Sequence, residues 1–104
     1  MSKVFLSDSI TTIGTHAFRI CTNLLSVEPK HNHSLQVIGE GAFNGCTNLL
    51  SVEFIDNPSI QFIGATAFSN CTSLSTITIP KQISTLEYTF QGCTELKTVT
   101  FENN

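Results

Sequence analysis

The chain repeats one apolar pattern four times, and this regularity constrains its fold more than any other feature. The repeats lie 25, 25 and 22 residues apart, measured between Phe18, Phe43, Phe68 and Phe90. A unit of this length cannot bury its apolar side alone, so successive units must stack and share one core. We therefore predict a single repeat domain over residues 1–104, with repeats at about 10–34, 35–59, 60–82 and 83–104.

Each repeat ends in alternating apolar and polar residues, which indicates a strand with one buried face. We expect parallel strands at about 25–28, 50–54, 75–79 and 97–101. The inward-facing side chains of the last three strands are predicted to be Leu49, Val52, Phe54, Leu74, Ile77, Ile79, Leu96, Val99 and Phe101.

The first half of each repeat is expected to form the opposite wall, with shorter strands at 36–38, 61–63 and 84–86. A glycine follows this segment in three repeats and is expected to make a corner at positive φ, at Gly14, Gly39 and Gly64. The Ala-Phe-x-x-Cys stretch is too short for an independent helix and predicts one helical turn. Val37 and Phe62 could form an exposed apolar patch, but we expect the loops 30–34 and 55–59 to cover them.

The complete unit reads I-x-x-I-G-x-x-A-F-x-x-C-x-x-L-x-x-V-x-F, and it resembles the BspA-like class of leucine-rich repeats over residues 10–101. The resemblance implies a leucine-rich-repeat solenoid that is mainly β, with a parallel sheet on its concave face and short helical or 3-10 turns on the other side. It also implies a location at the cell surface or outside the cell. The fourth repeat departs from the unit, with Glu87 in place of the glycine and Thr89 in place of the alanine.

Composition excludes several functional classes. The chain carries 5 basic and 8 acidic residues, for a formal net charge of -3. A nucleic-acid-binding protein needs a basic surface, so we expect no nucleic-acid partner. We also expect no insertion into a membrane, because the sequence holds no apolar run of about 18 residues. The first residues carry no recognisable secretory signal peptide.

The four cysteines occur once per repeat and form no Cys-x-x-Cys pair. They could be small buried apolar residues, disulfide partners or metal ligands, and the repeat spacing favours the first reading. His31 and His33 could hold a metal loosely, but a solvated loop is the simpler explanation. We predict no metal, no cofactor and no enzymatic activity, because no nucleophile elbow or phosphate-binding loop is present.

The outward-facing strand residues form the candidate ligand-binding face. It is rich in hydroxyl groups, with two acidic residues, and consists of Ser26, Glu28, Ser51, Glu53, Thr76, Thr78, Thr98 and Thr100. A solvated β-face with favourable strand propensity would carry the same residues. The leading hypothesis is a non-enzymatic module that binds a protein or a host-surface ligand through this concave face, as in adhesion.

The alternative hypothesis is a structural unit that stacks end to end into dimers or filaments. Only three residues follow Phe101, so we expect the apolar layer and the open strand edge of the last coil to face water. Either a longer natural chain or another copy would then cover this end.

Overall fold

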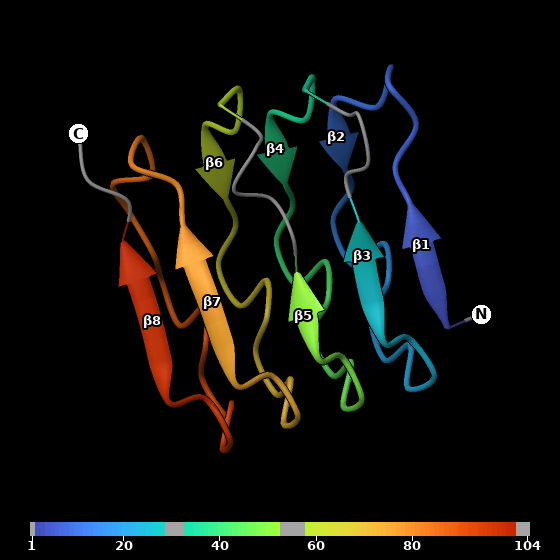
Figure 1. Cartoon of the computed structure of the whole chain (residues 1–104), viewed down its shortest axis with the longest axis vertical. Coiled ribbons are helices and arrows are strands. Elements are labelled where there is room, and N and C mark those ends of the chain that lie inside the picture. The colour runs from blue at the N-terminus through green and yellow to red at the C-terminus, as the bar shows by residue number, and fades with distance from the viewer. Residues whose placement is uncertain (1, 29–32, 53–57, 102–104) are drawn as a thin grey trace.

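The computed structural model of the chain describes residues 2–28, 33–52 and 58–101, and these residues form a stack of coils (Figure 1). The strands are β1 (Lys3–Phe5), β2 (Thr12–Ile13), β3 (Ser26–Glu28), β4 (Val37–Ile38), β5 (Ser51–Val52), β6 (Phe62–Ile63), β7 (Thr76–Ile79) and β8 (Thr98–Phe101). They pair in the orders β1-β3-β5, β2-β4-β6 and β7-β8, and every pairing is parallel.

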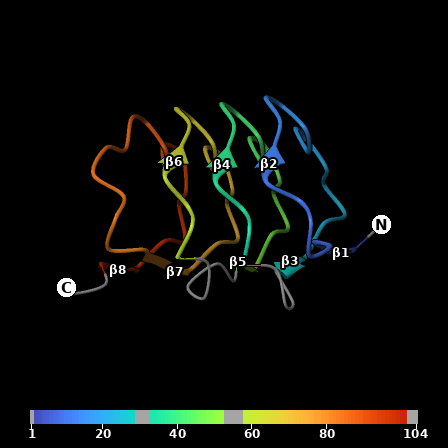
Figure 2. The same ribbon diagram turned by 90° about the horizontal axis from the view of Figure 1, so that it is seen from above.

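The strands build two walls on opposite sides of the stack, and Figure 2 shows both from above. One wall holds β1, β3, β5, β7 and β8, and the other holds β2, β4 and β6. The predicted strands are confirmed where the structure describes them, whereas residues 53 and 54 lie outside the described part. The expected strand at 84–86 is wrong, because these residues have no strand conformation.

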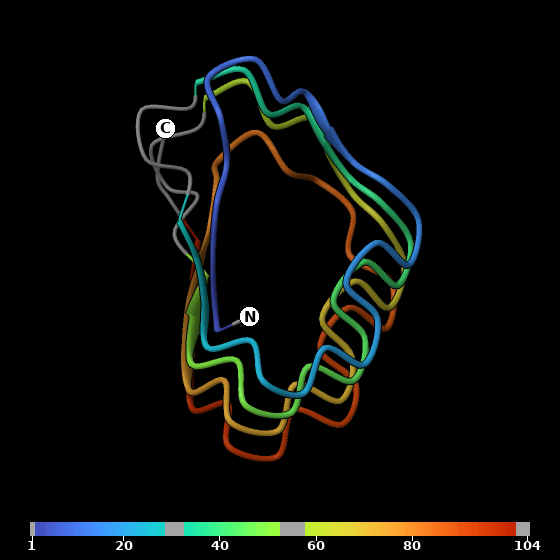
Figure 3. The ribbon, with the colours of Figure 1, turned by 90° about the vertical axis from the view of Figure 1, so that its right-hand side faces the viewer.

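The first three coils follow nearly the same path in the view along the stack, whereas the fourth departs from it on one side (Figure 3). In β7 and β8, Ile77 lies beside Val99 and Ile79 lies beside Phe101. This register keeps equivalent apolar residues in one column, because a slip of one residue would turn them to the other face.

The turns opposite the strands are held by two alternating kinds of backbone hydrogen bond. The N–H of Phe18 donates to the carbonyl of Ala42 in the next coil at 2.8 Å, whereas the N–H of Ala17 donates to Gly14 within its own coil at 3.1 Å. An α-helix would instead use each N–H for a bond to the fourth preceding residue. The expected helical turn is therefore a run of tight turns, and the described residues contain no helix.

Left-handed residues recur at two positions of these turns. The position two residues before each phenylalanine is left-handed in every coil, at His16, Gly41, Thr66 and Tyr88. The position before each cysteine is left-handed too, at Ile20, Gly45, Asn70 and Gly92. The expectation that Gly14, Gly39 and Gly64 take positive φ is wrong, because none of the three is among the residues with positive φ.

Gly39 and Gly64 have a different role, which is close packing against the preceding coil. A Cβ atom on Gly39 would lie 2.8 Å from the carbonyl carbon of Gly14, and one on Gly64 would lie 2.7 Å from the Cα of Glu40. Both contacts are with backbone, which cannot move aside without shifting the neighbouring coil. A Cβ on Gly14 would meet nothing within 4 Å.

The fourth coil is shorter than the third in this turn. The N–H of Thr66 donates to the carbonyl of Glu87, as the N–H of Gly41 donates to that of Ala65. Glu87 is therefore equivalent to Ala65, and not to the repeat glycine as the sequence alignment suggested. Leu86 packs against the core, as the isoleucine before the glycine does in the other coils, so the fourth coil has no residue at the glycine position.

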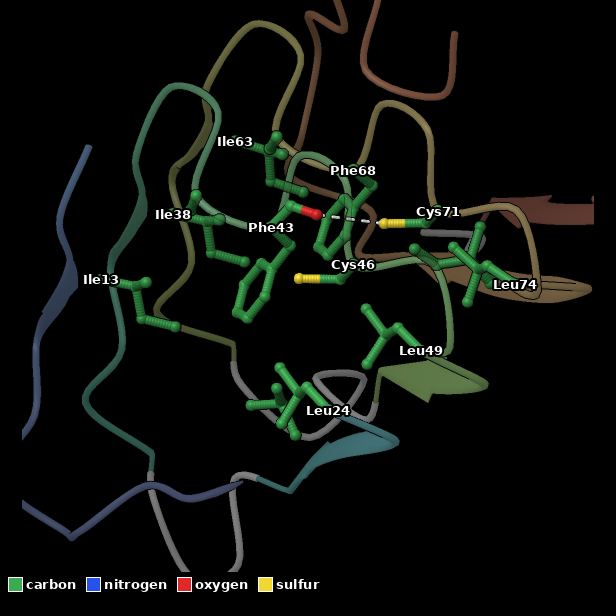
Figure 4. Close-up of a cluster of buried hydrophobic side chains, with 14 of the residues drawn as sticks. Ile13, Leu24, Ile38, Phe43, Cys46, Leu49, Ile63, Phe68, Cys71 and Leu74 are labelled. Atoms are coloured by element: carbon green, nitrogen blue, oxygen red, sulfur yellow. Dashed lines mark hydrogen bonds between the residues drawn. The ribbon is translucent and has the colours of Figure 1, made fainter. Parts of the chain in front are cut away.

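The core is a set of parallel columns, and the phenylalanines form the most regular one (Figure 4). Ring centroids of Phe18 and Phe43 lie 5.3 Å apart, those of Phe43 and Phe68 also 5.3 Å, and those of Phe68 and Phe90 6.0 Å. Phe43 and Phe68 are fully buried, as are Leu49 and Leu74 in the neighbouring column. The predicted shared interior is confirmed.

The last coil leaves its apolar side open. Val99 is 38% exposed and Phe101 58%, although their partners Ile77 and Ile79 are buried. The prediction that Val99 and Phe101 are core residues holds for the direction in which they point, but not for their burial. No described residue packs beyond them. Phe62 is also 52% exposed, so the prediction that loops cover it is wrong.

Candidate functional site

The candidate site is the outward surface of the wall that holds β1, β3, β5, β7 and β8, which we call the strand face. The parallel register aligns Lys3, Ser26 and Ser51 in one row across β1, β3 and β5. The same row continues on β7 and β8 as Thr76 beside Thr98. The predicted rows of the candidate site are therefore formed within each sheet.

A second row runs parallel to the first, near the ends of the strands. It begins with Phe5 beside Glu28 and ends with Thr78 beside Thr100. Glu53 was expected between them, but it lies outside the described residues. The acidic pair of Glu28 and Glu53 is therefore still a prediction.

Strand β1 adds residues to the face that the sequence analysis missed. The Nζ atom of Lys3 lies 3.3 Å from a carboxylate oxygen of Glu28 and 5.6 Å from the ring centroid of Phe5. The ion pair is largely solvent-exposed, so it contributes little to stability. It partly neutralises Glu28, and this end of the face is therefore less acidic than expected.

The N-terminal part of the face also carries exposed apolar side chains. Leu25 is 43% exposed and Leu50 55%, and the N–H of Leu50 donates to the carbonyl of Leu25 at 2.9 Å. Phe5, on the edge strand, is 53% exposed. The C-terminal part presents threonine hydroxyls instead, from Thr76, Thr78, Thr98 and Thr100.

A sequence signal for β1 does exist. Val4 and Leu6 point toward the core, as Ile77 and Ile79 do in β7, and Leu6 is buried. The segment Val4-x-Leu6 thus repeats the apolar alternation with which each repeat ends. The signal was missed because the rest of a repeat does not precede it.

The cysteines form a column of free thiols beside the phenylalanines. Three of the four thiols donate to the carbonyl of the phenylalanine one coil earlier, with Sγ–O distances of 3.0 Å for Cys46, 3.2 Å for Cys71 and 3.0 Å for Cys93. The reading as small buried residues holds for Cys46 and Cys71, but the hydrogen bonds add a role that the sequence analysis did not foresee.

Burial disfavours the charged thiolate at these positions. It raises the pKa of Cys46 to about 11 and that of Cys71 to about 12. Burial also raises the pKa of Cys93. A nucleophilic cysteine needs a lowered pKa and access to solvent, so Cys46 and Cys71 are suited to packing and not to covalent chemistry.

The histidines do not converge on a site in the described part of the chain. His16 lies in a turn with a φ of 58°, and its equivalents are Gly41 and Thr66. His33 is exposed, and His31 lies outside the described residues. No group of three or more histidine, cysteine or acidic residues that could hold a metal occurs among the described residues. The described part of the chain also holds no helix with the length and hydropathy of a membrane span.

Comparison with known proteins agrees with this architecture. The family model described as a BspA type leucine-rich repeat region of 6 copies matches residues 29–104. The crystal structure of the leucine-rich repeat protein of T. pallidum is similar, with a TM-score of 0.64 and 28% sequence identity. The similarity covers 93% of this chain but 57% of the T. pallidum chain. No curated protein sequence matches significantly. The chain, with its four stacked coils, belongs to the BspA-type leucine-rich repeat family.

Proposed function

We propose that residues 1–104 form a single leucine-rich-repeat domain that binds a protein through the strand face, without enzymatic activity. Leucine-rich repeats commonly mediate protein interactions, and the BspA type is often associated with the cell surface. We propose that this chain also acts at the cell surface, in adhesion to a protein or host-surface ligand.

The exposed pair Leu25 and Leu50 carries this proposal. Two large apolar side chains lie side by side on a wall whose neighbouring rows are mostly polar. Single exposed apolar residues are common on soluble proteins, but adjacent ones surrounded by polar groups mark interaction surfaces. Ser26 and Ser51 beside them, and the threonines of β7 and β8, offer hydroxyl groups that can both donate and accept hydrogen bonds.

The test is binding of the fluorescently labelled chain to an array of purified secreted and cell-surface proteins. We expect at least one arrayed protein to bind, and Leu25→Asp with Leu50→Asp to weaken that binding at least tenfold. Thr12→Asp with Gln36→Asp, on the opposite wall, is the matched control and should leave binding unchanged. Equal loss in both double variants, or binding that neither affects, would contradict the strand face as the site.

A second candidate function, end-to-end self-association, is supported by the open last coil. Val99 and Phe101 are exposed, whereas their neighbours Ile77 and Ile79 are 4% and 0% exposed. A β-strand edge beside an uncovered apolar layer is a template for another chain. Sedimentation of the 104-residue chain tests this function: a mass that rises with concentration, and that Phe101→Asp returns to the monomer, supports it. A monomer at every concentration contradicts it.

A further inference from the structure

The two ends of the stack present complementary backbone groups. In the first three coils, three alternating N–H groups of each turn donate to carbonyls of the next coil, as His16, Phe18 and Ile20 do to Glu40, Ala42 and Asn44. The equivalent donors of the fourth coil are the N–H groups of Tyr88, Phe90 and Gly92, and these have no acceptor among the described residues.

The first coil presents the matching acceptors. Its carbonyls equivalent to those of Glu40, Ala42 and Asn44 are the carbonyls of Thr15, Ala17 and Arg19, and they receive no inter-coil hydrogen bond in the described structure.

The thiol column is open at the same two ends, although its hydrogen bonds run in the opposite direction, from each cysteine to the preceding coil. Cys21 has no earlier phenylalanine carbonyl to donate to, and the carbonyl of Phe90 receives no thiol from a later coil in the described part.

The apolar columns are open at the same two ends. Phe18 and Cys21 are only half-buried in the first coil, and so are Phe90 and Cys93 in the fourth, whereas Phe43 and Phe68 between them are fully buried. Placing the fourth coil of one copy on the first coil of another would continue every column: Phe90 on Phe18, and the thiol of Cys21 beside the carbonyl of Phe90.

Strand β1 stands in the way of this contact. It pairs with β3 on the side where the preceding strand of a stack would lie, with Lys3 beside Ser26 and Val4 beside Val27. In β8, Thr98 pairs with Thr76 of β7 and Val99 pairs with Ile77, in the same parallel register. Thr98 and Val99 therefore occupy the same repeat positions as Ser26 and Val27. Residues 2–6 therefore occupy the place that residues 97–101 of another copy would take.

The described N-terminal segment covers only part of the first coil, so a second copy could bury more of it. Val4 and Leu6 of the segment pack on the core, and Leu24 and Val27 of the first coil are buried. The segment carries no turn, so Phe18 and Cys21 are left half-buried. A complete coil in the same place would cover the turn half of the end as well.

We propose that a second copy of this chain docks head to tail, its β8 taking the place of β1, and that β1 is the intramolecular competitor that blocks this docking. The inference rests on the second candidate function, end-to-end self-association. It adds the head-to-tail direction of the contact and the strand that blocks it. The covalent link gives β1 a high effective concentration at β3, so the closed form dominates while β1 keeps its inward side chains. A head-to-tail contact with a free end on each side leads to open filaments.

The test separates the two ends by mutation of the full chain. An acceptor chain carries Val4→Asp and Leu6→Asp, which release β1, together with Phe101→Asp, which blocks its own β8. The unmodified chain is the donor. At a concentration low enough for the unmodified chain alone to sediment as a monomer, we expect the acceptor chain alone to be a monomer as well, and their mixture to form a 1:1 complex. The chain with Val4→Asp and Leu6→Asp alone should form oligomers larger than a dimer.

The matched control changes the outward residues of the same strand, with Lys3→Arg and Phe5→Lys in place of Val4→Asp and Leu6→Asp. It keeps a favourable charge beside Glu28, leaves β1 paired with β3 and should form no complex. Circular dichroism establishes that each variant is folded; if the aspartates unfold the acceptor chain, Val4→Gly with Leu6→Gly releases β1 more mildly. A folded acceptor that forms no complex with the donor overturns the inference. Self-association of the unmodified chain that releasing β1 does not change also overturns it, while supporting the second candidate function.

Discussion

The ring of Phe43 lies parallel to the ring of Phe68, with an interplanar angle of 0° and centroids 5.3 Å apart. Both rings are fully buried, and each comes from the same position of a different coil. The pair shows how the repeat is stabilised, because one side chain fills the space between two coils and holds both together.

The first prediction concerns the phenylalanine column. Phe68→Ala should lower the free energy of unfolding by about 3–5 kcal/mol, because it removes a buried ring and leaves a cavity between coils. Phe90→Ala, at the same repeat position in the half-buried last coil, should cost clearly less. Urea denaturation of the two variants measures the difference, and equal costs would argue against a column that is closed in the middle and open at its end.

The second prediction concerns close approach of the coils at the repeat glycine. Gly64→Ala should destabilise the chain by about 1–3 kcal/mol, since its Cβ would press on the backbone of Glu40. Gly14→Ala should change stability by no more than about 0.5 kcal/mol, because its Cβ meets nothing within 4 Å. Thermal unfolding compares the two substitutions, which are chemically identical. A larger loss for Gly14→Ala would contradict the proposed packing.

The third prediction concerns Ile20, a β-branched residue with a φ of 59°. Its equivalents Gly45 and Gly92 are glycines, which take this conformation without strain. Ile20→Gly should therefore raise the free energy of unfolding by about 1 kcal/mol, since the exposed side chain contributes little burial. Arg19→Gly, one residue earlier, is the control and should destabilise. Chemical denaturation measures both, and a loss in the Ile20 variant would show that the strain is absent.

The fourth prediction concerns the pH dependence of stability. Burial raises the pKa of the Cys71 thiol to about 12, whereas an unfolded chain titrates near about 8.5. The unfolded state therefore loses this proton first as the pH rises. The stabilising contribution is complete below the unfolded pKa and is lost progressively up to the folded pKa.

Denaturation at about pH 8 and about pH 10.5 tests the fourth prediction, because the second condition lies between the two pKa values. The unmodified chain should lose more stability between these conditions than Cys71→Ala does. Titrating groups that do not interact with Cys71 are common to both chains and cancel in the comparison. The same loss in both chains would mean that Cys71 does not titrate differently in the folded state.

Much of the fold could be predicted from the sequence because each repeat gives an independent reading of the same position. The register of Ile77 beside Val99 follows from their shared place in the repeat, and a single unit would not have shown it. Strand β1 could not be found in this way, because Val4 and Leu6 are only a fragment of the pattern.

Other features depend on contacts between coils, which the sequence does not display. The role of Gly39 is an example: corner and close-approach glycines look alike in a sequence, and only the nearness of Gly14 distinguishes them. The place of Leu25 and Leu50 could be read from the repeat, because they share the repeat position of Ser75 and Lys97 and so belong to the outward face. Both are exposed in the structure.

The most direct test of the stacked-coil account is amide hydrogen exchange, followed residue by residue with NMR. The N–H groups of Phe18 and Phe43 donate across coils at 2.8 Å, whereas the N–H of Phe90 has no acceptor among the described residues. The account predicts slow exchange at Phe18 and Phe43 and fast exchange at Phe90 in the monomeric chain. Equally fast exchange at all three would contradict a fold in which each coil hydrogen-bonds to the next.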